Sequence, residues 1–421
     1  MMNLKGKKLL ILAASIHEAD LVRRAKELGV YTIVTDYYSP ERSPAKKIAD
    51  EAWNISWSDI DELEKKCREH KVDGVTAGYS EFAVECLIKL CERLNLPCYS
   101  TMRQLDITRD KVKFKQVCRK NQVPVVKEYS CIEDVKEYPV IVKPVDRAGS
   151  IGISVATDKK SLIDAYNYAM EMSVCKNVII EDFIYGQLKF DAFYSIIDGN
   201  ITLLSSCDTI NASNNGFEKV VQSAWVFPSK YHALFEETID DSIRQMLKDM
   251  DIKNGYVFFS GFCDGKSFKF FETGFRLSGG HMYRYTSEKG LADIQDIFIY
   301  HALTGSALDV ELGVDQKPNL KAVALNFYAL KGVIDTDISV EQIKEVRTCK
   351  YAIPMAIKGQ ECTDDKAILT KLAMVHIYSE NVDLLCEDVK TVNRLFQVKN
   401  TEGQDMIYDR IDCDVIREWW T

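Results

Sequence analysis

The sequence predicts a chain of mixed α/β and α+β class, in which a doubly wound parallel sheet precedes two further regions. Three observations favour this class. Apolar, strand-like runs alternate with amphipathic helical stretches up to about residue 100, hairpins mix with helices in the middle, and strand-rich sequence returns after about residue 310. Because 421 residues exceed one typical domain, we expect domains at 1–105, 106–310 (with a small subdomain at about 125–185) and 311–421.

The N-terminal region alternates strands and helices. Its first apolar run, residues 8–13, is too short for a membrane span or a signal core, so we interpret it as a buried strand. A helical stretch over 17–28 stops at Gly29. The further elements are a strand over 31–35, a helix over 59–70, a strand over 72–76, a helix capped by Ser80 and ending at 94, and a strand over 96–99. This order implies a parallel sheet.

A dinucleotide-binding domain is the alternative interpretation of this segment. It would need a G-x-G-x-x-G turn after the first strand, where backbone approaches a pyrophosphate. Residues 13–18 read Ala-Ala-Ser-Ile-His-Glu instead, and Asp36 then serves as a cap at the end of its strand. NAD binding is therefore disfavoured.

The middle and C-terminal regions mix hairpins with helices. A hairpin is expected over 256–272, around the turn Asp264-Gly265. The other expected strands cover 140–143, 178–181, 190–197, 201–208 and 322–331, and the helices cover 109–121, 161–172 and 231–250, with more near Ser339, Asp365 and Val389.

Composition excludes several classes of protein. The formal charge is −9 and no Lys/Arg run is concentrated enough to follow a phosphate backbone, which disfavours nucleic-acid binding. Thirteen cysteines, without a CxxC pair, argue against a disulfide framework or a zinc site and fit core residues in a reducing cytosol. We therefore expect a cytoplasmic enzyme with no membrane partner.

Lys143 opens the first informative cluster. A lysine at the end of a buried strand is costly unless its ammonium meets an anion. The turn that follows, with Gly149, Ser150 and Gly152, can present N–H groups to phosphate oxygens. The alternative is a lysine that reaches from the strand end into a surface turn.

The strand that contains Glu181 and Asp182 continues into a connector with Phe183 and Ile184. Backbone groups there can bind an adenine ring, and Glu181 could accept a hydrogen bond from the exocyclic amine. The alternative is an edge strand with a solvated acidic pair.

Glu272, Arg276, Gly279 and Gly280 form the third cluster. A carboxylate at the end of a hairpin strand can hold Mg²⁺ against phosphates, and an arginine can bind a carboxylate or phosphoryl group with two hydrogen bonds. The paired glycines allow close approach of backbone to a ligand. A glycine-rich surface loop with an incidental arginine is the alternative.

Two histidines accompany these clusters. His281 directly follows the paired glycines, and His17 begins the first helix. Either could orient a substrate or relay a proton. The alternative for each is a hydrogen-bonded surface histidine.

In order and spacing, these clusters resemble the ATP-grasp superfamily over about residues 1–310 and through the rest of the chain. The resemblance implies an ATP-grasp fold of two α+β subdomains over 106–310, with a lid at about 125–185. It also implies ATP and Mg²⁺ (or Mn²⁺), with catalytic roles for Arg276 and Lys143. The implied cofactor-binding residues are Lys111, Lys143, Gly149, Ser150, Gly152, Glu181, Asp182, Phe183, Ile184 and the metal ligand Glu272, and the implied substrate residues are Arg276, Gly279, Gly280, His281 and Glu81.

The function that this resemblance implies is ligation. A small-molecule carboxylate would be phosphorylated by ATP to an acylphosphate and coupled to an amine or another nucleophile, with release of ADP and phosphate. The C-terminal region would complete the substrate pocket or form a homodimer contact. No P-loop or protein-kinase motif competes with this interpretation.

Three positions depart from the family pattern. Gly274 stands where the family usually has Asn, Ser260 where it has a second metal carboxylate, and Leu188 where a ribose-binding Glu is common. Asp191 or Asp208 could supply the missing oxygen. These departures also leave open a catalytically attenuated ATP-grasp-like protein with a regulatory or scaffolding role.

Overall fold

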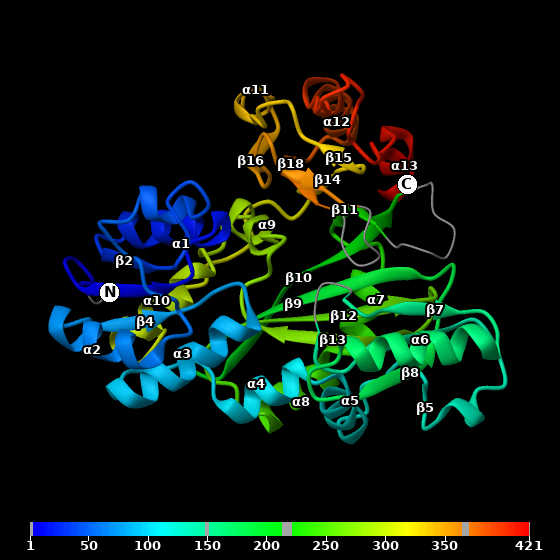
Figure 1. Ribbon diagram of the computed structural model, residues 1–421, viewed down its shortest axis with the longest axis horizontal. Coiled ribbons are helices and arrows are strands. Elements are labelled where there is room, and N and C mark those ends of the chain that lie inside the picture. The colour runs from blue at the N-terminus through cyan, green and yellow to red at the C-terminus, as the bar shows by residue number, and fades with distance from the viewer. Residues whose placement is uncertain (1–2, 148–150, 213–220, 364–369, 421) are drawn as a thin grey trace.

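The computed structural model describes residues 3–147, 151–212, 221–363 and 370–420. Three main sheets organise this part of the chain: a parallel one of four strands, an antiparallel one of eight and an antiparallel one of four (Figure 1). A two-stranded pair, β15 (Gly332–Val333) with β17 (Glu361–Cys362), completes the arrangement. This architecture confirms the predicted fold class.

The N-terminal sheet has the order β3-β2-β1-β4, and all its neighbours are parallel. Its strands are β1 (Lys8–Leu12), β2 (Tyr31–Thr35), β3 (Glu51–Trp53) and β4 (Gly74–Thr76), and its helices are α1 (Ile16–Glu27), α2 (Ile60–His70) and α3 (Glu81–Leu94). Ser15 caps α1 by accepting from the backbone N–H of His17. Apolar strands that are buried on both faces explain the continuous apolar run of β1.

A helix from much later in the sequence covers this sheet. α10 (Gln295–Thr304) packs so closely on β4 that a Cβ on Gly74 would lie within 3.0 Å of the backbone of Ala302. The N-terminal domain is therefore built partly from residues near 300.

The strand predicted over residues 96–99 is wrong. The chain leaves α3 through Asn95, whose φ of 54° lies in the left-handed region, and continues without strand structure. Pro97 has no N–H to donate to a sheet, which gives the physical reason.

The segment expected to form a lid, at about 125–185, contains the smaller antiparallel sheet with one helix across it, and we refer to this segment as the lid. Its strands are β5 (Glu128–Tyr129), β6 (Val140–Pro144), β7 (Ser154–Ala156) and β8 (Val178–Asp182), in the order β5-β8-β6-β7, and its helix is α6 (Lys159–Met172). Val140, Val142 and Ile180 pack under α6. Because strand residues alternate between faces, Lys143 and Glu181 lie on the opposite face.

The large sheet joins the middle and C-terminal regions. Its order is β13-β12-β9-β10-β11-β14-β18-β16. The strands are β9 (Leu188–Ile197), β10 (Asn200–Asn211), β11 (Gln222–Phe227), β12 (Gly255–Cys263), β13 (Phe268–Phe275), β14 (Lys321–Tyr328), β16 (Cys349–Pro354) and β18 (Lys371–Ser379). Residues after 310 thus extend the sheet that carries the middle region.

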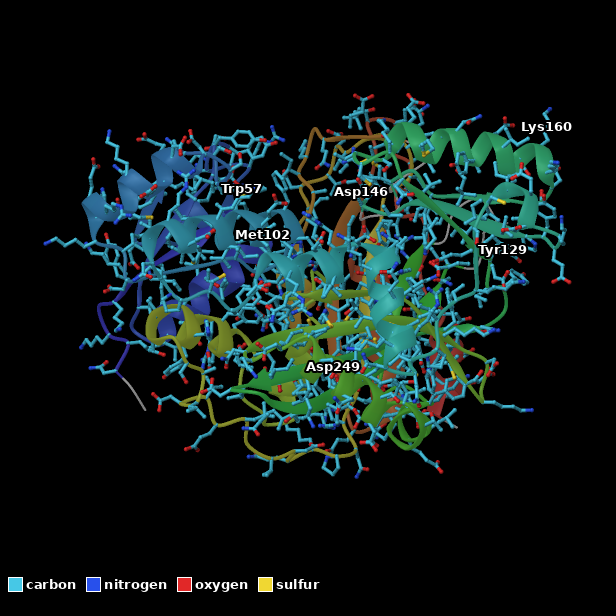
Figure 2. All side chains as sticks on the ribbon, turned by 90° about the horizontal axis from the view of Figure 1, so that it is seen from below. Trp57, Met102, Tyr129, Asp146, Lys160 and Asp249 are labelled. Atoms are coloured by element: carbon cyan, nitrogen blue, oxygen red, sulfur yellow. The ribbon has the colours of Figure 1, made fainter. Side chains whose placement is uncertain are left out.

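Helices flank this sheet at several places. α4 (Met102–Arg109) and α5 (Lys111–Lys120) connect the N-terminal domain to the lid. The others are α7 (His232–Thr238), α8 (Asp240–Asp249), α9 (Tyr283–Glu288), α11 (Glu341–Lys344), α12 (Val382–Leu395) and α13 (Cys413–Arg417). Figure 2 shows the N-terminal domain, with Trp57, and the lid, with Tyr129 and Lys160, at opposite ends of the molecule.

Two further expectations concern membranes and cysteines. Within the described residues, no helix has the length and apolar character needed to cross a membrane. The cysteines are free; Cys131 and Cys175 are exposed, Cys98 is half-buried and the others are buried. The helix expected near Asp365 falls largely outside the described residues.

Candidate nucleotide and substrate site

Two buried lysines share one buried carboxylate where the lid meets α5. Lys143 Nζ lies 2.6 Å from Glu181 Oε2, and Lys115 Nζ binds Glu181 Oε1 and the carbonyl oxygen of Val126. Burial opposes ionisation of Glu181, but the charges of Lys143 and Lys115 hold its pKa below the usual range. Burial in turn lowers the pKa of Lys115 to about 8.

This arrangement changes the interpretation of Glu181. Both its oxygens are committed to lysines, so the carboxylate is not disposed to accept from an adenine amine. It fixes Lys143 on the inner face of the lid, where the ammonium lies 5.2 Å from the centre of the Phe271 ring on β13. The lid and the large sheet therefore face each other at Lys143.

Lys111 joins the same cluster. Its ammonium donates to the carbonyl oxygen of Arg147 at 2.8 Å. Burial lowers the pKa of Lys111, and the charges of Glu272 and Lys143 both act on it. The structure thus brings together the two lysines and the acid that the sequence singled out.

A cavity of about 310 Å³ lies at the end of β8 and beside the connector that follows it. It is lined by Glu137, Tyr138, Pro139, Asp182, Phe183, Ile184, Tyr185 and Gln187. Tyr129 donates to the Asp182 carboxylate at 2.6 Å, which holds the end of the strand in place. Of the residues expected to bind the adenine ring, Asp182, Phe183 and Ile184 therefore border a cavity at the edge of the lid, and Glu181 does not.

The turn after Lys143 is described only in part. Gly149 and Ser150 lie outside the described residues. Gly152 has φ +75°, and a Cβ there would lie within 3.0 Å of Pro144 and Met172. This position therefore requires glycine for conformation and for space.

Glu272, Ser260 and Asp191 form a row across three neighbouring strands. Ser260 pairs in register with Glu272 on β13 and with Asp191 on β9, so the three side chains share one face of the sheet. Ser260 donates to Asp191, and Lys189 Nζ lies 2.8 Å from Asp191 Oδ2. Glu272 makes no side-chain hydrogen bond or ion pair with another described residue.

This row fits a divalent cation with one carboxylate ligand from the protein. Glu272 is the carboxylate in this row whose oxygens have no partner among the described residues, whereas the Asp191 carboxylate already accepts hydrogen bonds from Lys189 and Ser260. Mg²⁺ commonly takes one or two carboxylates and completes its shell with phosphates and water. Asp208 belongs elsewhere: it accepts from Ser229 and Trp419, away from the cleft.

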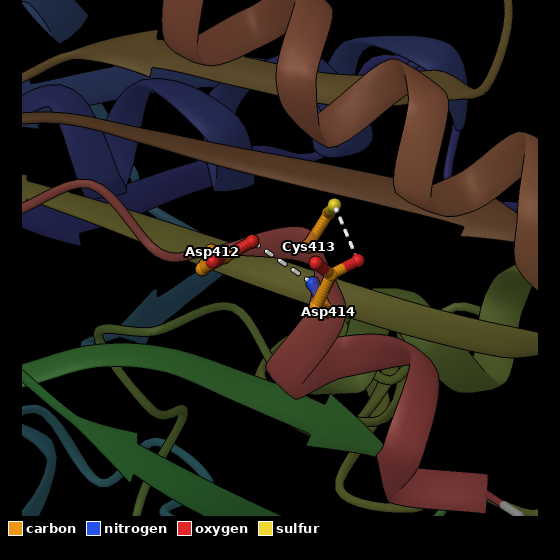
Figure 3. Close-up of side chains that lie close together, drawn as sticks. All are labelled: Asp412, Cys413 and Asp414. Atoms are coloured by element: carbon orange, nitrogen blue, oxygen red, sulfur yellow. Dashed lines mark hydrogen bonds between the residues drawn. The ribbon is translucent and has the colours of Figure 1, made fainter.

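A second acidic group of metal-ligand type lies near the C-terminus. Figure 3 shows Asp412, Cys413 and Asp414, whose ligand atoms lie within 4.8 Å of one another. Asp412 caps α13 by accepting from the N–H of Asp414, and Asp414 also pairs with Arg417 at 3.2 Å. Capping and a surface ion pair account for this group without a metal.

Arg276 pairs with Glu81 across the boundary between domains. Its Nε lies 2.6 Å from Glu81 Oε1, at the first residue of α3. The guanidinium also lies 5.4 Å from the centre of the Phe258 ring. A Cβ on Gly274 would lie within 3.0 Å of that ring. The Phe258 ring therefore occupies the space that an Asn side chain at position 274 would need, which explains why this position is glycine.

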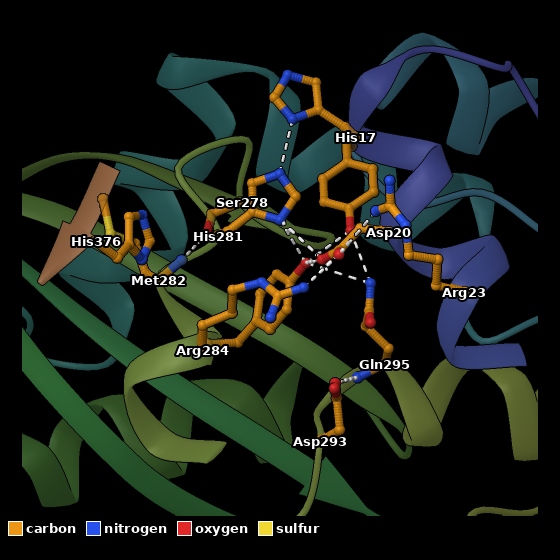
Figure 4. Close-up of polar contacts among 12 residues, drawn as sticks. His17, Asp20, Arg23, Ser278, His281, Met282, Arg284, Asp293, Gln295 and His376 are labelled. Carbon is orange, nitrogen blue, oxygen red and sulfur yellow. Dashed lines mark hydrogen bonds and ion pairs between the residues drawn. The ribbon is translucent and has the colours of Figure 1, made fainter. Parts of the chain in front are cut away.

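The Gly279–Gly280 loop lies between the N-terminal domain and the large sheet. Gly279 faces His17, and a Cβ on Gly280 would lie 3.3 Å from the indole of Trp225. His281 is fully buried beneath this loop and contacts His17, so neither histidine is a simple surface group (Figure 4). His17 itself is half-buried.

Lys371 is a functional candidate that the sequence reasoning missed. Its ammonium lies 5.3 Å from the Trp225 ring and 5.4 Å from the Tyr328 ring, without an ion pair to a described carboxylate. Burial lowers its pKa to about 8. The only signal in the sequence is a lysine beginning an apolar strand, which also fits a solvated strand end. The sequence reasoning also missed Lys115 on α5, Asp20 on α1 and Lys189 on β9, whose partners lie far away along the chain or on the same strand.

The parallel N-terminal sheet, the lid and the large antiparallel sheet define the class: the chain has an ATP-grasp fold. The family described as "D-ala D-ala ligase C-terminus" matches residues 94–253. The formate-dependent phosphoribosylglycinamide formyltransferase of Prochlorococcus marinus subsp. pastoris is 29% identical over 202 residues, which cover 45% of this chain and 50% of that protein. The chain spans about half the length of the curated relatives it matches.

Solved structures share the fold over nearly the whole chain. The L-amino acid ligase of Bacillus licheniformis superimposes with a TM-score of 0.75 at 18% identity, covering 94% of this chain and 99% of that one. A second structure is the biotin carboxylase domain of the Hydrogenobacter thermophilus 2-oxoglutarate carboxylase, in complex with MgADP and bicarbonate. It superimposes with a TM-score of 0.73 at 17% identity, covering 95% of this chain and 91% of that one. These likenesses establish the fold.

Proposed function

We propose that this protein is an ATP-dependent ligase that phosphorylates a small-molecule carboxylate and couples the acylphosphate to an amine. The observation that carries the proposal is that Lys111, Lys143 and Glu272 lie close to one another where the lid faces the large sheet, near the Arg276–Glu81 pair. Lys111, Lys143 and Arg276, with Glu272 as a carboxylate that has no partner among the described residues, suit a triphosphate with its metal ion and a second anionic substrate. The cavity beside the connector after β8 offers a place for the adenine ring.

Each of these residues has a distinct part in the proposed reaction. Lys143, held by Glu181, and Lys111 offset phosphate charge from the lid and from α5. Arg276, held by Glu81 and Phe258, retains donors for the substrate carboxylate. Glu272 would hold Mg²⁺ (or Mn²⁺), which supplies charge neutralisation at the phosphates when bound.

Lys371 supports an anionic substrate on the other side of the loop. A partly enclosed ammonium without a carboxylate partner is costly, and a carboxylate or phosphate on the substrate would offset that cost. We assign it to a substrate group remote from the reacting carbon. The substrate would then carry at least two anionic groups or an anionic group and an amine.

ADP release with Mg²⁺ and ATP, measured across amino acids and small carboxylates with ammonium or a second amino acid, tests the proposal. We expect turnover with at least one carboxylate, and loss of at least a hundredfold in Lys143→Ala. The matched control is Lys160→Ala, an exposed lysine on the outer surface of α6. Undiminished turnover in Lys143→Ala would exclude the assignment.

A nucleotide-binding protein with a regulatory or scaffolding role is the second candidate. It is favoured by one observation: Asp191, in the row with Glu272, is occupied by Lys189 and Ser260. The same screen separates the two functions. Saturable Mg-ATP binding without ADP release for any carboxylate would support the scaffold and reject the ligase.

A further inference from the structure

A polar network links α1 of the N-terminal domain to the Gly279–Gly280 loop and the residues that follow it (Figure 4). His17 Nδ1 lies 2.8 Å from His281 Nε2, and the two rings stack with centroids 5.1 Å apart. His281 is fully buried with φ +52°, a left-handed conformation that costs energy for a residue other than glycine. The backbone N–H of His281 donates to the carbonyl oxygen of Ser278 at 2.9 Å. The loop is therefore shaped to put this imidazole against His17.

The other edge of His281 meets an ionised carboxylate. His281 Nδ1 lies 3.3 Å from Asp20 Oδ2 and 2.7 Å from the Tyr283 hydroxyl, which itself donates to Asp20 at 3.2 Å. Arg284 binds the second oxygen of Asp20. Burial opposes ionisation of Asp20, but the hydrogen bond from His281 and the charge of Arg284 hold its pKa well below the usual range. Asp20 can therefore only accept hydrogen bonds.

These contacts fix where the protons are. Because Asp20 only accepts, His281 carries its proton on Nδ1. Burial lowers the pKa of His281, so the ring is neutral and its Nε2 is an acceptor. His17 must then donate from Nδ1, and a neutral His17 keeps a bare lone pair on Nε2. The network thus selects one tautomer of His17.

The charges around His17 keep it neutral when the cleft holds no anion. Burial and the neighbouring His281 lower the pKa of His17 to about 3. Lys371 and Arg276 act in the same direction, and Asp20 opposes them. A carboxylate or phosphate paired with Lys371 and Arg276 would remove part of this effect. His17 would then become a better proton acceptor when an anionic substrate is in place.

His17 borders the loop where the second substrate would bind. Its Cε1 lies 4.0 Å from the position of a Cβ on Gly279, three residues after Arg276. The Tyr79 ring packs beside both histidines, with its centroid 5.4 Å from that of His17 and 5.2 Å from that of His281. Arg276 and Lys371 can present only donors to this region, whereas His17 presents a lone pair. The Nε2 lone pair of His17, which lies near the cationic side chains of Arg276 and Lys371, is suited to accept a hydrogen bond from the N–H of an amine.

We propose that His17 Nε2 takes the proton of the amine nucleophile in the coupling step, with His281 and Asp20 as positioning residues. This inference rests on the proposed ligase function. An ammonium substrate gives one proton to Nε2, and its freed lone pair attacks the carbonyl carbon of the acylphosphate. The C–N bond forms, the C–O bond to phosphate breaks with its electron pair leaving on phosphate, and the second N–H proton passes to that phosphate. Asp20, through His281, stabilises the imidazolium.

His17→Gln tests the proposal by separating the two half-reactions. With a carboxylate that supports turnover in the wild type, hydroxylamine trapping reports acylphosphate formation, and amide formation from the amine reports coupling. We expect trapping within twofold of the wild type but coupling at least a hundredfold slower near pH 7. The lost coupling rate should return as pH rises toward the amine's own pKa. His70→Gln, at the distant end of α2, is the control.

Each other result decides a different question. Unchanged coupling in His17→Gln, or an equal loss of trapping and coupling at every pH, would overturn the His17 assignment alone. Absence of carboxylate-dependent ADP release in the wild type would overturn the ligase function and this inference with it. Nitrogen-15 histidine spectra of the wild type should show His17 neutral with its proton on Nδ1, and a proton on Nε2 would overturn the relay. His281→Asn should weaken coupling less than His17→Gln does.

Discussion

Replacement of Glu181 by Gln tests the electrostatic organisation of the lid. The carboxylate is 1% exposed and is shared by Lys115, which is 0% exposed, and Lys143, which is 6% exposed. Gln keeps the shape but leaves Lys143 without its counter-charge and Lys115 with only the more distant carboxylate of Glu128, at 3.8 Å. Removal of one partner from a buried ion pair costs about 3–5 kcal/mol. We expect a loss of that size in the free energy of unfolding of the lid.

Urea denaturation and hydrogen exchange measure this effect at different scales. A local loss of about 3–5 kcal/mol corresponds to roughly a hundred- to several-thousandfold faster exchange of the amides of β6 and β8. Glu133→Gln, an exposed acid of the same subdomain, is the control and should change stability by less than about 0.5 kcal/mol. A loss below about 1 kcal/mol in Glu181→Gln would refute the reasoning.

A second variant and pH sharpen the test. Lys115→Met combined with Glu181→Gln leaves Lys143 as the one charge among these three residues, which keeps their net charge as in the wild type. The double variant should therefore lose less free energy of unfolding than the sum of the losses of the two single variants. The lowered pKa of Glu181 means that its contribution is present above its ordinary pKa of about 4.3 and is lost as pH falls through the folded value. The gap between wild type and Glu181→Gln should therefore narrow below about pH 4.

Two further substitutions probe the cleft. Lys371→Met should raise the KM for the carboxylate substrate at least tenfold without lowering Tm, because the ammonium has no ion-pair partner among the described residues. Steady-state kinetics and thermal denaturation measure these two effects. A fall in kcat with an unchanged KM would contradict the prediction. Gly274→Asn should destabilise the protein by about 1–3 kcal/mol in urea denaturation, because the new side chain would meet the Phe258 ring. Phe258→Ala in the same chain should remove most of that penalty. If the losses of the two single variants simply add in the double variant, the prediction is contradicted.

The sequence alone determined the fold class and the strands that carry the lysine, acid and arginine. Apolar runs separated by helical stretches specify β1, β2 and β4 locally, since strand periodicity and helix caps are written in adjacent residues. Lys143 and Glu272 were identifiable because a charged group at the end of a buried strand is costly without a ligand.

Tertiary structure decided which groups are free. Glu181 and Asp191 look like available carboxylates in the sequence, yet both are bound by lysines, one of them 66 residues away along the chain. Lys371 and His17 come near each other only because β18 and α1 both pack around the Gly279–Gly280 loop and Trp225. Ion pairing depends on distances of a few ångströms between distant segments, and no local pattern encodes those distances.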